Sequence, residues 1–339
     1  MLHALKQIAY YTAARSRIST LIANSEWRKK RLSILCYHGL SLDDEHIWNP
    51  GLFMTGQNFR SRIVWLRRSG YNILPLGESV ERLANGTLPA RAVAITFDDG
   101  NYDFLVNAAP VLQEFSVPAT VYMTTYYSAF NRPVFDPMLS YLLWKASGKT
   151  LSGPEPLRAG VLLNKEGRSF AWKAISGYAL QAGLSGADKD VLLHDIATRL
   201  GLDYDCICAR RILHRMNPDE VSACSSRGVD IQLHTHRHRV PRERDAFVRE
   251  LEDNRIALCG IGHAEFKHFC YPSGVYYPES KDYLRHYGLV SATTCDPGLA
   301  SPSTDPYYLP RFCDSTVTPC SVFNAWNSGA SMFFRLNRQ

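Results

Sequence analysis

Two aspartates follow an apolar run in the stretch AITFDDGNYD at residues 94–103. Adjacent carboxylates repel, and burying them is costly unless a cation or a proton compensates. Asp98 and Asp99 point to opposite faces of an ideal strand, so they share a site only where the strand ends. Gly100 supplies the permissive backbone for that turn. The stretch therefore predicts a cation ligated by one carboxylate, with the other free to accept a proton.

Histidines follow a second apolar run, in QLHTHRHR at residues 232–239. In an extended strand His234 and His238 would lie about 13 Å apart, so they share a metal only if the chain turns between them. One aspartate and two histidines give three protein ligands with open positions, the arrangement of a catalytic metal site that activates water. A structural histidine cluster or a solvated loop is the alternative. The ligand types suit zinc first, with iron, cobalt and nickel as alternatives.

These motifs lie among short apolar runs that alternate with helical patterns, which indicates βα units and a parallel sheet. His38, Asp98 and His234 fall at the carboxyl ends of such runs, where barrel enzymes build their sites. Seven predicted strands favour a barrel. They are residues 32–38, 71–76, 92–97, 119–125, 229–234, 268–272 and 289–294.

The chain divides into four parts by pattern. Residues 126–228 have helical periodicity and predict a helical insertion between the fourth and fifth strands. We expect a basic helical segment at 1–31, a discontinuous barrel at 32–125 and 229–312, and a C-terminal tail at 313–339. Within the barrel, Phe59, Ile63 and Leu66 share one face of a predicted helix.

TFDDG at 96–100 and H-T-x-x-H at 234–238 resemble the first two motifs of the NodB-homology polysaccharide deacetylases, carbohydrate esterase family 4. The order of segments is similar as well, over roughly residues 34–125 and 216–312. The resemblance implies an α/β fold, a distorted (β/α)7 barrel of the NodB type. It also implies that Asp98 is the general base of a metal-dependent deacetylase, and that Asp99, His234 and His238 ligate the metal.

The chain departs from this family at its third motif. CYPSG at 270–274 places Cys270 and Ser273 where the family often has the arginine and tyrosine of R-P-P-Y-G. Arg311 in LPRF is similar to an arginine found in members with Y-P-x-G motifs, so the resemblance implies that Arg311 steadies the base. The backbone N–H of Ser273 is then the candidate oxyanion donor.

The family's fifth motif, L-x-H, is absent, since no histidine follows His286. His38 in ILCYHGL resembles the Y-H of the poly-N-acetylglucosamine exopolysaccharide deacetylases, whose acid lies near the N-terminus. A histidine suits proton donation near neutral pH, so His38 is the candidate general acid. His236 matches no ligand position and is expected to be structural.

The amino-acid composition of the chain indicates which classes of partner and which compartment to expect. The chain has 339 residues, 45% of them apolar, and a formal net charge of +6. Residues 1–31 carry seven basic side chains against one acid, which accounts for that excess, so no nucleic-acid partner is indicated. Nine scattered cysteines without a secretory-type leader predict reduced thiols and a cytoplasmic protein.

The first residues have a near-helical apolar spacing with basic residues between, which predicts a helix on an anionic membrane face. The alternative is a basic helix packed on the domain or a partly disordered segment. The apolar positions are Leu2, Leu5, Ile8, Ala9, Ile18, Leu21 and Ile22.

The expected partner is an N-acetylated carbohydrate, as a polysaccharide or as a precursor that is lipid-linked at the inner membrane face. Two other functions remain open. One is a catalytically impaired carbohydrate-binding protein, favoured by the altered third motif and the missing fifth. The other is a hydrolase of O-acetyl esters or cyclic amides that keeps the same site.

Overall fold

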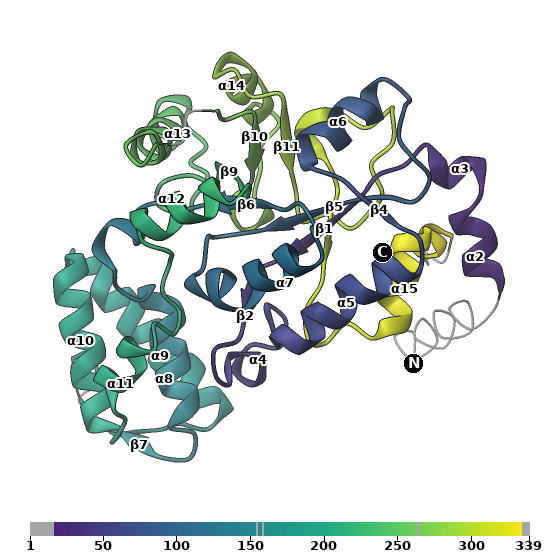
Figure 1. The fold of residues 1–339 in the computed structure, drawn as a ribbon. Helices are drawn as coiled ribbons and strands as arrows, with labels where there is room; N and C mark the ends of the chain where they lie inside the picture. Colours follow the sequence, from purple (N-terminus) through teal and green to yellow (C-terminus); the bar gives the residue numbers. More distant parts are fainter. Residues whose placement is uncertain (1–16, 154, 158, 263–264, 334–339) are drawn as a thin grey trace.

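The computed structural model describes residues 17–153, 155–157, 159–262 and 265–333. Its centre is an eight-stranded sheet in the order β11-β10-β9-β6-β5-β1-β12, with β4 paired to β5 off this path. The sheet is curled and surrounded by helices (Figure 1). Its ladders are parallel. The strands are β1 (Ser33–Tyr37), β4 (Asn72–Ile73), β5 (Ala92–Phe97), β6 (Thr120–Met123), β9 (Asp230–Leu233), β10 (His268–Cys270), β11 (Ser291–Thr293) and β12 (Phe312–Cys313).

All seven predicted strands are present, and β5 matches its prediction at both ends. The predicted strand at 71–76 is shorter because Pro75 caps helix α6 (Leu76–Ala84). β12 was not predicted, since two residues carry no periodicity, yet it pairs with the buried strand β1 through Leu35 and Phe312. β1 and β5 are buried along their whole length, as expected of central parallel strands.

The two ends of the sheet path approach each other. Thr293 of β11 forms an isolated parallel bridge with Leu309, three residues before β12. Residues 309–313 thus lie between β11 and β1, which carries Arg311 to the strand ends that bear Asp98. The closed seven-stranded barrel stays a prediction.

Helices pack on the outside of the sheet. In α5 (Gly56–Arg68), Phe59, Ile63 and Leu66 are fully buried, which confirms the predicted face. α13 (Arg244–Cys259) buries Asn254 among its apolar positions. The remaining helices around the sheet are η1 (Phe104–Ala108), α7 (Ala109–Glu114), α12 (Pro218–Ser226), α14 (Ser280–His286) and α15 (Cys320–Ser328).

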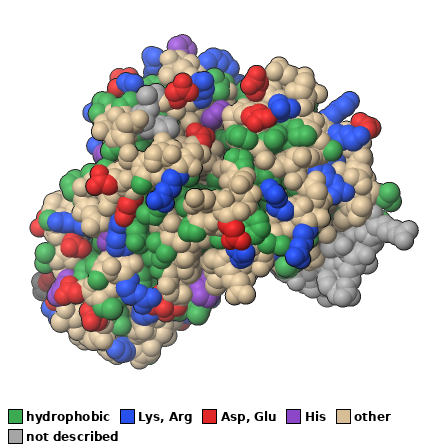
Figure 2. Space-filling model, in the orientation of Figure 1, with side chains coloured by type: hydrophobic (Ala, Val, Ile, Leu, Met, Phe, Trp, Pro, Cys, Tyr) green, Lys and Arg blue, Asp and Glu red, His purple; other side chains and the backbone are tan. Residues whose placement is uncertain are grey.

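Between β6 and β9 the chain forms a helical lobe, at the lower left of Figure 1. It has its own hydrophobic cluster, which includes Leu139, Leu142, Ile175 and Ile196. Apolar side chains gather where the lobe meets the rest of the molecule (Figure 2). The lobe contains α8 (Phe135–Lys145), the small antiparallel pair β7 (Thr150–Leu151) and β8 (Val161–Leu162), α9 (Lys165–Gln181), α10 (Gly186–Arg199) and α11 (Tyr204–Ala209).

The described parts of the two terminal segments pack together. α2 (Arg17–Ala23) and α3 (Glu26–Lys29) lie beside α15 (Figure 1). Arg28 is fully buried and donates to the carbonyls of Asn327 and Ala92, so this basic side chain is not available to a membrane. The predicted apolar positions at residues 2–9 lie outside the described residues. Within the described part of the chain, no helix is both long and apolar enough to span a bilayer.

Candidate active site

Asp98 and Asp99 lie at the turn that follows β5. Asp99 and Gly100 both have positive φ, 76° and 71°, so the chain reverses immediately after the strand. A Cβ on Gly100 would lie 1.9 Å from Sδ of Met123, so the turn accepts only glycine without rearrangement. The turn lets the two neighbouring carboxylates reach different partners.

The turn after β9 brings His234 and His238 together. Thr235 and His238 adopt positive φ, and the two imidazole centroids lie 5.0 Å apart. Asn254 of α13 accepts the backbone N–H of His234 and donates to the carbonyl of Met123, which ties this turn to β6. The side chains of Asp99, His234 and His238 thus offer ligand atoms within 4.8 Å of one another.

One oxygen of Asp99 fits a cation. Oδ1 is buried without a hydrogen-bond partner among the described residues, and it lies 3.4 Å from Nε2 of His234 and 3.1 Å from Nε2 of His238. Nδ1 of His234 lies 2.8 Å from the carbonyl of Cys270, to which it donates, leaving a lone pair on Nε2. Burial lowers the pKa of His234, which favours this neutral form. A lone pair facing a carboxylate oxygen is unfavourable unless a cation lies between them, so these residues suit a metal ion.

The other oxygen of Asp99 is paired with Arg215, whose Nη2 lies 3.1 Å from Oδ2. Arg215 also donates to Asn101, which in turn donates to the carbonyl of His38. Burial alone would raise the pKa of Asp99, but the charge of Arg215 opposes this and holds that pKa well below its usual value. Asp99 therefore stays ionised.

Asp98 forms a buried bidentate pair with Arg311. Nη1 and Nη2 of Arg311 each lie 2.7 Å from an oxygen of Asp98, and both side chains are almost fully buried. Arg311 is held in turn by the carbonyl of Thr294 and the hydroxyl of Thr96. Burial alone would raise the pKa of Asp98, yet the Arg311 charge and hydrogen bonds keep that pKa below its usual range. Asp98 is thus held as an ionised carboxylate in a fixed orientation.

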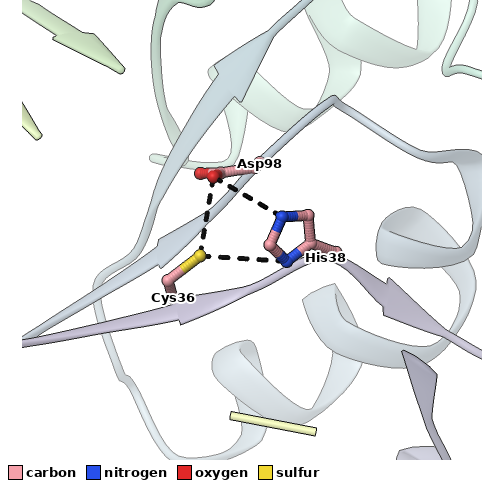
Figure 3. Close-up of side chains that lie close together, drawn as sticks. All are labelled: Cys36, His38 and Asp98. Atoms are coloured by element: carbon pink, nitrogen blue, oxygen red, sulfur yellow. Dashed lines mark hydrogen bonds and ion pairs between the residues drawn. The ribbon is translucent and has the colours of Figure 1, made fainter. Parts of the chain in front are cut away.

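His38 and two thiols complete the surroundings of Asp98. Figure 3 shows Cys36, His38 and Asp98 pointing toward one another from the adjacent ends of β1 and β5. Nε2 of His38 lies 3.8 Å, and Sγ of Cys36 and of Cys270 each 3.5 Å, from Oδ2 of Asp98. Burial raises the pKa of the Cys36 thiol to about 12, so it stays protonated. Arg311 bonds both oxygens of Asp98, whereas Oδ1 of Asp99 is left without a partner among the described residues, so the Asp99 cluster is the better cation site.

A cavity of about 280 Å³ is lined by His38 and Asp99 of this site, and we call it the reaction cavity. Trp48 and Trp172 form part of its apolar wall, and their indole N–H groups are bonded to Ser140 and to the carbonyl of Asp136. Much of that wall comes from the helical lobe. The lining residues include His38, Asp99, Asn101 and Arg215 from the sheet side and Val134, Asp136, Pro137, Ser140 and Trp172 from the lobe.

The structure places the other predicted residues as follows. Ser273 is exposed in a short turn after β10 with φ 56°, three residues beyond Cys270. His236 points away from the cluster, with Nδ1 2.8 Å from the hydroxyl of Thr125. The sequence analysis missed Arg215, Asn101, Trp48 and Trp172 as residues of the site. The one signal that could have identified Asn101 is its position directly after Gly100 of the DDG motif.

The polysaccharide deacetylase family model matches residues 85–141 and 205–292. Over these ranges the chain is similar to the polysaccharide deacetylases. Residues 142–204, which the family model leaves unmatched, lie within the helical lobe. The matched ranges include Asp98, Asp99, His234 and His238.

Curated deacetylases are similar to the chain over short stretches. The chain is 38% identical over 72 residues to the poly-beta-1,6-N-acetyl-D-glucosamine N-deacetylase of Staphylococcus epidermidis, covering 21% of this chain and 25% of that protein. It is 30% identical over 101 residues to the protein of that name from Escherichia coli K12, covering 30% of this chain and 15% of that protein. The chain thus spans a quarter or less of the length of these relatives.

Solved deacetylase structures share the fold of the chain. The Streptococcus pyogenes deacetylase PplD in complex with acetate matches with a TM-score of 0.57 at 18% identity, over 86% of this chain and 96% of that one. IcaB from Ammonifex degensii matches with a TM-score of 0.55 at 17% identity, over 88% and 97%. These likenesses confirm the α/β fold of the NodB-type deacetylases.

Proposed function

We propose that the protein is a metal-dependent polysaccharide deacetylase that hydrolyses N-acetyl groups on the sugar units of a polysaccharide or its precursor. The observation that carries this proposal is the unpartnered oxygen of Asp99 facing two imidazole nitrogens, beside an Asp98 held ionised by Arg311. The names of the curated relatives support poly-beta-1,6-N-acetyl-D-glucosamine as the first substrate to test.

In this proposal Asp99, His234 and His238 hold the metal, zinc first and iron, cobalt or nickel as alternatives. When bound, the metal supplies Lewis-acid activation of water and of the acetyl carbonyl. Asp98 accepts the proton of the attacking water, since its carboxylate is ionised and oriented.

The remaining residues act on the leaving group and the oxyanion. His38, which lines the reaction cavity, donates a proton to the leaving amine. Arg311 fixes the orientation of Asp98 through two hydrogen bonds. The backbone N–H of Ser273 is the proposed oxyanion donor.

We also propose the finer details of the fold. They are a distorted (β/α)7 barrel and a helical insertion at residues 126–228. The bridge between Thr293 and Leu309 supports closure of the sheet. The unmatched residues 142–204 support an insertion.

We further propose that the reaction takes place in the cytoplasm, at the inner membrane face. Its substrate there would be a lipid-linked precursor. The nine cysteines, all within the described residues, are free, as expected in a reducing compartment. Leu21, Lys29 and Lys30 are exposed on the helices near the start of the chain. Co-sedimentation with vesicles containing anionic lipid tests the contact, and the double charge reversal Lys29→Glu and Lys30→Glu should abolish it.

The function is tested by acetate release from N-acetylglucosamine oligomers, β-1,6-linked ones included, and from acetylated xylan. Wild type is compared with Asp98→Asn, with and without chelator. We expect chelator-sensitive release that the substitution abolishes. Release from xylan alone would favour the esterase alternative. If the protein binds metal but releases no acetate, the tested substrates are wrong. If it binds no metal, the alternative of a catalytically impaired carbohydrate-binding protein is favoured.

A further inference from the structure

A second cavity, of about 330 Å³, lies on the other side of one stretch of chain from the reaction cavity. Residues 132–137 form the shared wall. Val134 and Asp136 line the reaction cavity, whereas Arg132, Pro133 and Phe135 line the second one. The two cavities are therefore separated by this segment, which includes the first turn of α8.

Aromatic rings form one side of the second cavity. The ring of Tyr126 lies 5.2 Å from that of Tyr127 and 5.3 Å from that of Phe130, in edge-to-face arrangements. Phe130 is 56% exposed, so its apolar face is open to a ligand. Tyr126 also donates its backbone N–H to the carbonyl of His236, which stands between His234 and His238. The aromatic wall is thereby fixed to the same turn as the predicted metal ligands.

Polar groups also line the second cavity. Arg132 and Lys189 bring N–H donors, and Asp190 brings a carboxylate, one oxygen of which accepts from Tyr204. The ammonium of Lys189 lies 5.6 Å from the centre of the Phe135 ring. Aromatic faces combined with a few fixed donors and acceptors suit a sugar ring, which has apolar C–H faces and hydroxyls at its edge. The volume is within the range of ligand cavities, about 300–1,000 Å³.

We infer that the second cavity binds a further sugar unit of the same N-acetylated glycan whose reacting unit occupies the reaction cavity. The glycan crosses the shared wall between Asp136, which lines the reaction cavity, and Phe130, which lines the second one, and both are exposed. This inference rests on the proposed function and narrows its substrate to a chain of several sugar units, not a single amino sugar.

The experiment compares deacetylation of the dimer and the hexamer of N-acetylglucosamine by wild type, Phe130→Ala and Lys189→Ala. Each variant should raise KM for the hexamer about tenfold, the loss typical of one aromatic or polar anchor, with kcat and the dimer KM unchanged. Phe170→Ala is the matched control. Phe170 is 58% exposed on α9 and lines neither cavity. Equal effects on dimer and hexamer, or no effect of either variant, would overturn the inference.

A binding arm separates this inference from the proposed function. Calorimetry with Asp98→Asn and the hexamer measures affinity without turnover, and adding Phe130→Ala should weaken it about tenfold. If wild type releases no acetate but this weakening is found, the proposed reaction fails and the sugar site stands. If the hexamer binds no tighter than the dimer, the sugar site is rejected whether or not acetate is released.

Discussion

Replacing Arg311 by leucine should destabilise the protein strongly. Arg311 and Asp98 are both almost fully buried and joined by two hydrogen bonds of 2.7 Å. Removing one partner of such a pair leaves an uncompensated buried charge and costs about 3–5 kcal/mol of unfolding free energy. The carbonyl of Thr294 and the hydroxyl of Thr96 also lose their donor, so the upper part of that range is expected.

The loss of unfolding free energy in Arg311→Leu should depend on pH. In wild type the pKa of Asp98 lies below its value of about 3.9 in the unfolded chain, so the pair stabilises the fold above that pH. This contribution falls as the pH drops toward the folded pKa. In Arg311→Leu the charge of Arg311 no longer opposes the effect of burial, so the pKa of Asp98 rises. The free-energy cost of the unpaired buried charge then disappears once the carboxyl is protonated. The difference between the two proteins should therefore be largest above the raised pKa of Asp98 in the variant and shrink as the pH falls toward about 3.9.

Urea unfolding followed by circular dichroism at pH 7 and pH 4 measures this difference in the metal-free proteins. Arg311→Lys keeps a positive charge without the paired hydrogen bonds and should lose less than Arg311→Leu. The double variant with Asp98→Asn should recover part of the loss, because no charge is left unpaired. A difference below about 1 kcal/mol at pH 7, or one that does not change with pH, would refute the reasoning.

Three further substitutions test other parts of the site. Asp99→Asn should weaken metal binding by more than about 100-fold in a chelator competition titration, because it alters a proposed ligand; unchanged affinity would place the metal elsewhere. Gly100→Ala should cost about 1–3 kcal/mol of unfolding free energy and more than Gly86→Ala, since both have positive φ but only Gly100 has an atom, Sδ of Met123, in the way. Equal losses would show that the contact is relieved without cost. His38→Gln should lower kcat about 10²- to 10⁴-fold with metal content unchanged, and a smaller loss would remove His38 as the acid.

The strands and the ligand motifs could be predicted because each is a local pattern. β5 is a continuous apolar run that ends in two aspartates, and its limits are readable without knowledge of the partners. Arg215 was not predictable, since a bridge to Asn101, far away in the sequence, brings it to Asp99. Trp172 was equally hidden, because only the packing of the lobe turns it toward the cavity.

Parts of the chain that looked uninformative prove to complete the core. The predicted tail contains α15, which buries Phe323, and the ring of Trp326 stacks on that of Phe312. β12 is too short for any periodicity, so its place beside β1 depends entirely on tertiary pairing.

The position of Arg311 has a consequence for the order of folding. It lies 213 residues after Asp98, on a segment that also joins β11 to β1. As the chain is synthesised from its N-terminus, β5 is complete long before its counter-charge exists. Contacts this distant in sequence are slow to form, and burying Asp98 before Arg311 arrives is costly. The docking of residues 309–313 is thus expected to be a late step, one that joins β11 to β1 and gives Asp98 its counter-charge at the same moment.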